Sequence, residues 1–97
     1  MTYLSNMFEV TKEISNGKRI IVTETGWPSF GETVESAVPS RINAMKYFIL
    51  SQQWAKINKL EIFHFSSFDE SWKVIQEGKL GTSWGLWDKN EKFKYKK

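Results

Sequence analysis

Glu24 is the first residue in the chain whose type and position could support catalysis. It follows an Ile-Ile-Val run at 20–22, and a β-branched apolar run of this kind is typical of a strand buried on both faces, as in parallel sheets. A Gly-Trp-Pro turn follows at 26–28. Parallel sheets and barrels carry their chemistry at the carboxyl ends of their strands, so Glu24 is a candidate catalytic acid. The alternative is an exposed or ion-paired glutamate.

The elements that would position Glu24 alternate between helix and strand. Two strands separated by a helix pair in parallel through a right-handed crossover, so the residues after both strands should lie at one end of the sheet, with Glu24 and Glu70 facing one cleft. The patterning predicts an α/β chain whose elements are helix 3–15, strand 18–24, loop 25–38, helix 39–58, strand 60–68, loop 69–83 and a short extended piece at 84–87. The second helix is expected to start at Pro39. Its apolar residues on or near one face are Ile42, Met45, Phe48, Ile49 and Ala55.

The segment at 23–29, Thr-Glu-Thr-Gly-Trp-Pro-Ser, resembles the signature of glycoside hydrolase family 17, the β-1,3-glucanases and their relatives. The resemblance implies that Glu24 is the nucleophile of a retaining reaction, in which one carboxyl group attacks the anomeric carbon and another protonates the leaving oxygen. It also implies a (β/α)8 TIM barrel. Because such a barrel takes typically ~250 residues, the 97 residues are expected to form one partial domain, the C-terminal portion with parallel strands seven and eight and flanking helices.

A second segment, Phe-Asp-Glu-Ser-Trp-Lys at 68–73, is similar to the family's Phe-(Asn/Asp)-Glu-x-x-Lys motif at the end of the last barrel strand. This resemblance implies that Glu70 and Lys73 line the sugar-binding cleft, where a lysine would favour the ionised form of the nucleophile. Phe30, Phe68 and Trp72 are candidate surfaces for sugar stacking. The alternative is a solvated, charged loop.

A third segment, Ser-Trp-Gly-Leu-Trp at 83–87, resembles the family's (Phe/Trp)-Gly-Leu-(Phe/Trp) motif. Plant members carry a further glutamate just before that motif, where this chain has Gly81. The family's acid/base glutamate follows the fourth strand in an Asn-Glu context, and nothing N-terminal to Glu24 resembles that strand. Glu9 and Glu13 lie on the predicted first helix, where we expect them to be solvated.

Composition argues against several other classes of function. The net charge of +3 is mild, and no basic patch coincides with a nucleic-acid-binding module; the clustered lysines 89, 92, 94, 96 and 97 are expected to form a solvated terminus. Cysteine is absent, no cluster of His, Asp and Glu resembles a metal site, and no cofactor is expected. His64, the single histidine, is expected to be a hydrogen-bonded core or cleft-floor residue.

The sequence predicts neither a membrane span nor a signal peptide, since a basic segment followed by an apolar core is missing at the N-terminus. The family resemblance implies an extracellular or cell-wall location for a parent enzyme and β-glucan as its partner. Three interpretations stay open: part of a β-1,3-glucanase or glucanosyltransferase, a β-glucan-binding module without turnover, and a truncated gene product that does not fold alone. Open sheet edges should favour self-association.

Overall fold

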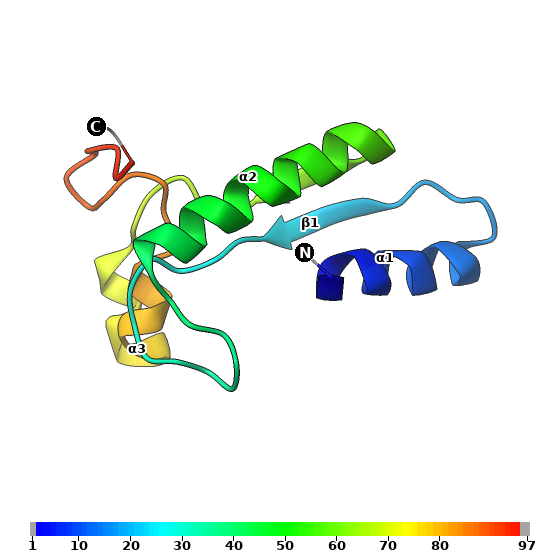
Figure 1. Ribbon diagram of the computed structural model, residues 1–97. Helices are drawn as coiled ribbons and strands as arrows, with labels where there is room; N and C mark the ends of the chain where they lie inside the picture. The colour runs from blue at the N-terminus through cyan, green and yellow to red at the C-terminus, as the bar shows by residue number, and fades with distance from the viewer. Residues whose placement is uncertain (1, 96–97) are drawn as a thin grey trace.

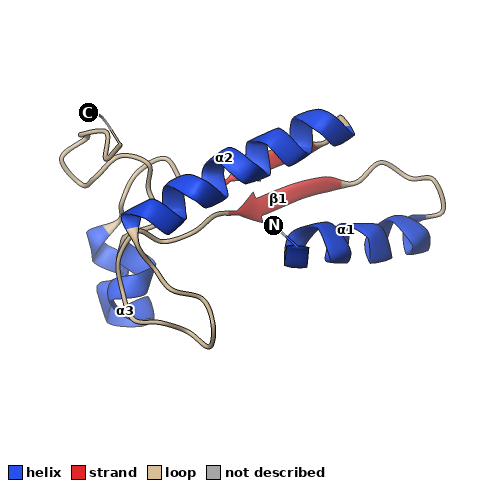
Figure 2. Cartoon of the chain, in the orientation of Figure 1, coloured by secondary structure: helices blue, strands red, loops and turns tan. Residues whose placement is uncertain are grey.

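The computed structural model describes residues 2–95 (Figures 1 and 2). They form a parallel two-stranded sheet, with helices before, between and after the two strands along the chain. In Figure 1, α2 runs alongside the sheet, and α3 lies beyond the arrowhead of β1. The elements are α1 (Thr2–Ser15), β1 (Ile21–Thr25), α2 (Arg41–Asn58), β2 (Glu61–His64), the one-turn 3-10 helix η1 (Ser71–Lys73) and α3 (Val74–Thr82).

The register of the sheet places the carboxyl ends of both strands together. Ile21 is paired with Glu61, and Thr25 is paired with His64, in a parallel arrangement. The predicted α/β class and parallel pairing are therefore confirmed, whereas the barrel of which the sheet would be a part stays a prediction. The loops after β1 and β2 leave the sheet at the same end, which is where the candidate site residues lie.

An aromatic contact joins α1 to α2. The ring of Phe8 meets Trp54 of α2 edge-on, with centroids 5.5 Å apart. Asn16 and Gly17 adopt positive φ angles of 54° and 82°, which ends the helix as expected and returns the chain toward β1. Phe8 is buried, whereas Ile14 of the same helix is exposed, so the described residues cover only part of the apolar surface of α1.

The boundaries of α2 follow from its caps. The side chain of Ser40 accepts a hydrogen bond from the Asn43 amide, and Lys59 closes the helix in the left-handed conformation. Serine is a strong N-cap residue because its oxygen satisfies a free amide of the first turn. The predicted start at Pro39 is therefore wrong, and the helix begins at Arg41.

The buried face of α2 also differs from the predicted one. Its buried residues are Ala44, Ser51 and Ala55, which recur at helical spacing, and α2 packs against β2. The apolar residues expected on that face are mostly exposed, namely Ile42, Met45 and Ile49. The prediction was right for Ala55, which is buried, and for Phe48, whose ring contacts His64 of β2, but hydropathy did not indicate the small buried residues Ala44 and Ser51.

Residues 65–83 depart most from the predicted elements. The second strand ends at His64 instead of Phe68, and the Phe65–Ser66 peptide bond is cis. The following residues pair instead with the predicted extended piece at 84–87: Ser66 N–H donates to Trp84 O, and Trp87 N–H donates to Ser67 O. The predicted loop at 69–83 is wrong, because it contains η1 and α3. Two glycines had indicated a loop, but Gly78 only kinks the helix.

The C-terminal segment packs against the rest of the structure. The ring of Phe93 lies 5.2 Å from Trp87 between centroids, and the Lys94 amide donates to Leu86 O. The side chain of Lys94 is only 8% exposed, so the expectation of a solvated terminus is wrong for this lysine. Lys96 and Lys97 lie outside the described residues.

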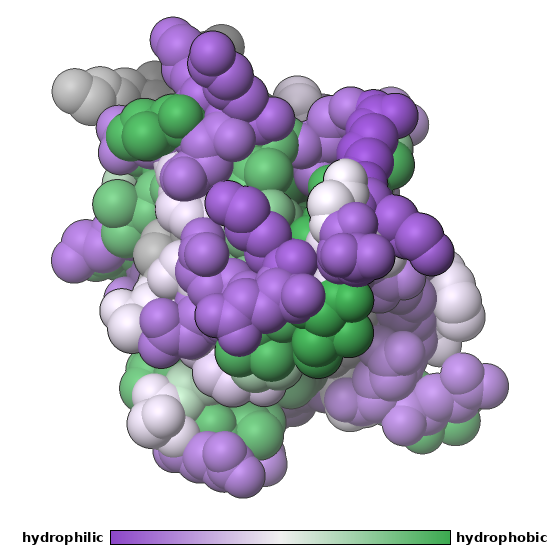
Figure 3. Space-filling model, turned by 90° about the vertical axis from the view of Figure 1, so that its right-hand side faces the viewer, coloured by the Kyte–Doolittle hydropathy of each residue, from purple (hydrophilic) through white to green (hydrophobic). Residues whose placement is uncertain are grey.

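The described residues bury few apolar side chains, namely Phe8, Ala44 and Ala55. Much apolar surface is exposed, as the green areas among purple ones in Figure 3 show. Within the described part of the chain, no helix combines the length and hydropathy that a membrane span requires.

Candidate active site

The end of β1 is held in place by two hydrogen bonds. The hydroxyl groups of Thr25 and Tyr47 lie 2.6 Å apart, and the Phe65 amide donates to Thr25 O at 2.7 Å. Thr25 is buried. Since successive side chains of a strand point to opposite faces, this anchor directs the neighbouring Glu24 to the other face, where it is exposed.

Glu24 opens into a depression with aromatic and acidic walls. The depression has a volume of about 420 Å³ and is lined by Glu24, Thr25, Gly26, Phe65, Glu77 and Trp84. The rings of Phe65 and Trp84 meet at 68° with centroids 5.9 Å apart. Carboxylates that accept hydrogen bonds, next to flat apolar rings, are suited to a ligand that carries both hydroxyl groups and apolar faces.

The Gly-Trp-Pro turn follows β1, and its first residue, Gly26, lines the depression. A Cβ atom at Gly26 would collide with the backbone carbonyl of Phe65, so glycine is required by close approach of two backbone segments. The Trp27 indole donates to Val38 O at 2.9 Å, and its ring lies 5.5 Å from that of Tyr47. Through these contacts Trp27 connects the turn to Val38 and to α2.

Glu70 and Lys73 lie at the same end of the sheet but outside the depression of Glu24. The Lys73 ammonium is 3.3 Å from Glu70 Oε1 and 4.6 Å from the centroid of the Phe65 ring. The lysine side chain is only 12% exposed. Phe65 therefore both contacts the Lys73 ammonium and lines the depression of Glu24, whereas Glu70 and Lys73 are not among the residues that line the depression.

The three candidate stacking residues are exposed but are not gathered around Glu24. Trp72 lies beside the Lys73 ammonium at 5.5 Å. Phe68 packs on Trp87, and Phe30 lies 5.9 Å from the Lys79 ammonium. All three are about half exposed or more, so a ligand could reach them, but none lines the depression.

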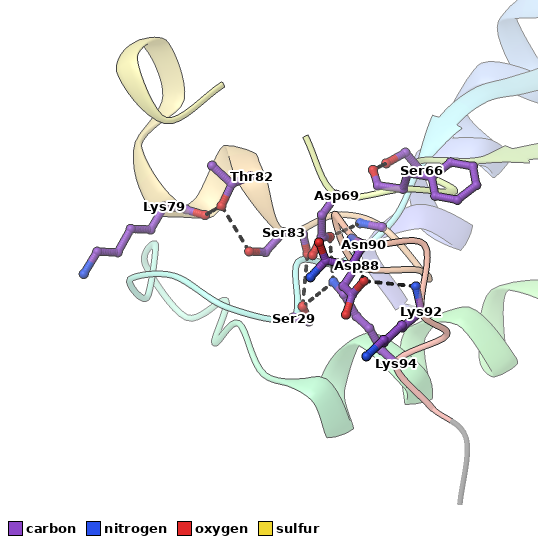
Figure 4. A network of polar contacts seen from close by, with 12 residues as sticks. Ser29, Ser66, Asp69, Lys79, Thr82, Ser83, Asp88, Asn90, Lys92 and Lys94 are labelled. Carbon is purple, nitrogen blue, oxygen red and sulfur yellow. Dashed lines mark hydrogen bonds and ion pairs between the residues drawn. The ribbon is translucent and has the colours of Figure 1, made fainter. Parts of the chain in front are cut away.

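A polar network that the sequence analysis missed joins the loops of the site (Figure 4). Asp69 Oδ1 accepts from Lys94 Nζ at 2.6 Å and from the Gly85 amide at 2.9 Å. Lys94 also donates to Ser29 Oγ, whose hydroxyl donates to Ser83 O. The ion pair between Lys94 and Asp69 therefore lies at the centre of a network that joins four segments of the chain. Periodicity and motif spacing carried no signal for this network.

His64 lies at the end of β2, where Phe48 of α2 packs edge-on at 4.9 Å between ring centroids. Burial lowers the pKa of His64 below its ordinary value of 6.5, because the charged imidazolium is disfavoured away from water. Its Nδ1 atom is buried without a hydrogen-bond partner, so the expected hydrogen-bonded state is not seen at this atom. Within residues 2–95, no three His, Asp or Glu side chains are grouped to hold a metal ion.

Glu77 was not among the predicted site residues, because it lies outside the family motifs that indicated Glu70, Trp72 and Lys73 in the expected loop at 69–83. The structure places it on α3 and in the wall of the depression of Glu24. A Cβ atom at Gly81 would collide with the side chain of Glu77. The sequence signal for this position is Gly81, four residues after Glu77. Because glycine has no side chain, it leaves room for the Glu77 carboxylate on the same helix.

Comparisons with known proteins agree with the motifs. Residues 1–85 match the family model of the BtgE/BtgC glycoside hydrolase domain. A protein of Aspergillus clavatus named probable beta-glucosidase btgE is 34% identical over 85 residues, which are 86% of this chain and 14% of that protein. A glucan 1,3-beta-glucosidase of Saccharomyces cerevisiae is 34% identical over 79 residues, 76% of this chain and 24% of that protein. The chain thus spans less than a quarter of the length of these relatives.

Solved structures give the same family. An active-site mutant of the Rhizomucor miehei beta-1,3-glucanosyltransferase in complex with laminaritriose superposes with a TM-score of 0.89 and 26% identity, over 97% of this chain and 34% of that one. A second structure from the same organism, described as a glycoside hydrolase family 17 beta-1,3-glucanosyltransferase, has a TM-score of 0.84, 28% identity and the same coverage. The motifs around Glu24 and Glu70, the matched domain and these structures together show that the chain belongs to glycoside hydrolase family 17.

Proposed function

We propose that the chain forms the part of a (β/α)8 barrel that contains strands seven and eight, and that Glu24 is the nucleophile of a retaining reaction on β-1,3-glucan. The observation that carries this proposal is the position of Glu24 at the carboxyl end of a parallel strand, in a depression lined by Phe65 and Trp84. Carboxylates in such positions attack the anomeric carbon in retaining glycosidases. The ligand of the Rhizomucor enzyme, laminaritriose, supports glucan as the substrate class.

Glu70 and Lys73 are proposed to bind sugar hydroxyl groups beside the nucleophile. The Lys73 ammonium lies near both Glu70 and the Phe65 ring, so a sugar that contacts Phe65 would lie close to both groups. Phe30, Phe68 and Trp72 are proposed as outer stacking surfaces, where apolar sugar faces would cover exposed rings. The proposed place of action is outside the cell or in the cell wall, in keeping with the glucan-acting names of the relatives.

The nucleophile assignment is tested in a complete barrel that carries this segment. Glu24→Ala should abolish turnover of laminarin and leave glucan binding largely intact, because the nucleophile acts mainly in the transition state. Glu70→Ala and Lys73→Ala should weaken binding and turnover less severely. Glu13→Gln, a glutamate on α1 away from the depression, is the matched control. Near-normal rates after Glu24→Ala would overturn the assignment.

A second candidate function is glucan binding without turnover. It is favoured by the exposed rings of Phe30, Phe68 and Trp72, which are suited to sugar stacking. Within the 97 residues of the chain, no segment N-terminal to Glu24 resembles the family's acid/base segment. General acid catalysis contributes typically ~10²–10⁴-fold, so we expect the 97-residue chain to show no appreciable hydrolysis of laminarin. Robust turnover by the purified chain, abolished by Glu24→Gln, would rule out this second function.

Hydrolysis and transfer are separated by their products. Both solved relatives are described as glucanosyltransferases, which favours transfer to a second glucan. Mass spectrometry of laminaritriose incubated with a complete barrel should then show oligosaccharides longer than the substrate. Products that are all shorter than the substrate would favour hydrolysis.

A further inference from the structure

The carboxylate of Glu77 shares the depression of Glu24 although it comes from a different element. Glu24 is the last residue but one of β1, whereas Glu77 lies in the first turn of α3. Both residues line the same depression of about 420 Å³, together with Phe65 and Trp84. Any ligand that reaches Glu24 across these rings therefore also meets Glu77.

The backbone of α3 holds Glu77 in this place. On a regular helix, the Cβ atoms of residues four apart are ~5–6 Å from each other. Gly78 interrupts the helix with φ 69° and ψ −168°, and this kink folds the turn that carries Glu77 back against Gly81. The Cα atom of Gly81 is buried against the Cβ atom and carboxylate of Glu77, with no room for a side chain of its own.

Glu77 also has no cation to satisfy its charge. The ion pairs of the described residues join Arg19 with Glu61, Lys73 with Glu70, and Lys94 with Asp69, and none of them includes Glu77. The carboxylate is exposed and is free to accept hydrogen bonds from a ligand. Ionised acceptors form stronger hydrogen bonds with hydroxyl groups than neutral acceptors do.

We infer that Glu77 is a substrate-binding residue, whose carboxylate accepts a hydrogen bond from a hydroxyl group of the glucose unit bound beside Glu24. This inference rests on the proposed function of the site as a β-1,3-glucan site. Phe65 and Trp84 contact the apolar faces of the sugar, and Glu77 selects the unit by its hydroxyl pattern. The kink at Gly78 and the bare Cα of Gly81 position the carboxylate.

The test is a titration of the full chain with laminaritriose, followed by NMR chemical shifts. Glu77→Gln keeps the shape of the side chain and removes its charge, and Glu13→Gln on α1 is the matched control. Loss of one charged hydrogen bond should weaken binding about 10-fold, whereas the control should bind like the wild type. Thermal unfolding of Glu77→Gln should match that of the wild type, which separates binding from a structural role.

A second variant tests the positioning. Gly81→Ala should displace the Glu77 side chain and weaken binding to a similar extent, while the double variant with Glu77→Gln should lose no more than either single variant. If the wild type binds laminaritriose and Glu77→Gln binds equally well, the inference is overturned and the glucan site stands. If the wild-type chain does not bind laminaritriose at all, glucan binding by this chain is overturned together with the inference.

Discussion

The ammonium group of Lys94 lies 2.6 Å from Asp69 Oδ1, with side chains that are 8% and 16% exposed. This buried ion pair attaches the C-terminal segment to the loop that carries Glu70. Breaking a buried pair by removing one partner leaves the other charge uncompensated, which costs about 3–5 kcal/mol. The pair should therefore be one of the larger single contributions to the stability of the site loops.

Lys94→Met and Asp69→Asn should each lower the free energy of unfolding by about 3 kcal/mol, measured by urea denaturation. The double variant should be less destabilised than the sum of the two, because neither charge is then left alone. Lys89→Met, in an exposed turn of the same segment, serves as the control. Strictly additive losses in the double variant would show that the two side chains do not interact in solution.

Gly26 should tolerate no side chain. A Cβ atom there would collide with the carbonyl oxygen of Phe65, which is backbone and cannot rotate away. Gly26→Ala should therefore cost about 1–3 kcal/mol through backbone displacement, and it should disturb the NMR signals of Phe65 and Trp84. At Gly17 no atom lies within 4 Å of the added Cβ, although its φ is +82°. Gly17→Ala should lack the effect on the two aromatic rings, and equal shifts there in both variants would refute the close approach.

The sequence predicted the place of Glu24 at the carboxyl end of the first strand well, because that place depends on local pattern. Glu70 lies at the same end of the sheet, but it follows β2 by six residues and does not line the depression of Glu24, so the expected shared cleft is not seen. A β-branched run followed by Glu24, and a helix between two strands, suffice to place Glu24 and Glu70 at one end of a parallel sheet. The structure has these features. The catalytic and sugar-binding roles of the two residues stay predictions.

The features that the sequence did not predict depend on contacts between distant segments. The Lys94 to Asp69 pair joins residues 25 positions apart, and nothing in the local pattern of either segment indicates it. The buried face of α2 was predicted only in part: Ala55 is buried as expected, whereas the small residues Ala44 and Ser51 are buried without a hydropathy signal. α3 was missed because Gly78 and Gly81 suggested a loop. In the fold, Gly78 forms a kink within the helix, and Gly81 packs against the side chain of Glu77.

His64 should make stability depend on pH near neutrality. Burial lowers its pKa in the folded chain below 6.5, so the unfolded chain binds a proton first as the pH falls. Stability should be fully present above pH 6.5 and should be lost as the pH falls from there through the lowered pKa. His64→Gln should remove this part of the slope, measured as the difference between the two unfolding curves at pH 5 to 8. Parallel curves over this range would contradict a buried neutral imidazole.

The last prediction concerns self-association of the 97-residue chain. The sheet has two strands and thus two edges, and large apolar side chains such as Ile21 and Phe63 are 39% and 61% exposed on them. Unpaired strand edges and exposed apolar patches promote association between chains. Sedimentation should therefore show oligomers whose proportion rises with concentration, and the melting temperature should rise with it. Phe63→Lys should reduce association, because a charge on an edge strand opposes pairing. A sharp melting transition of a monomer, unchanged over a hundredfold range of concentration, would show instead that the described elements form a self-sufficient domain.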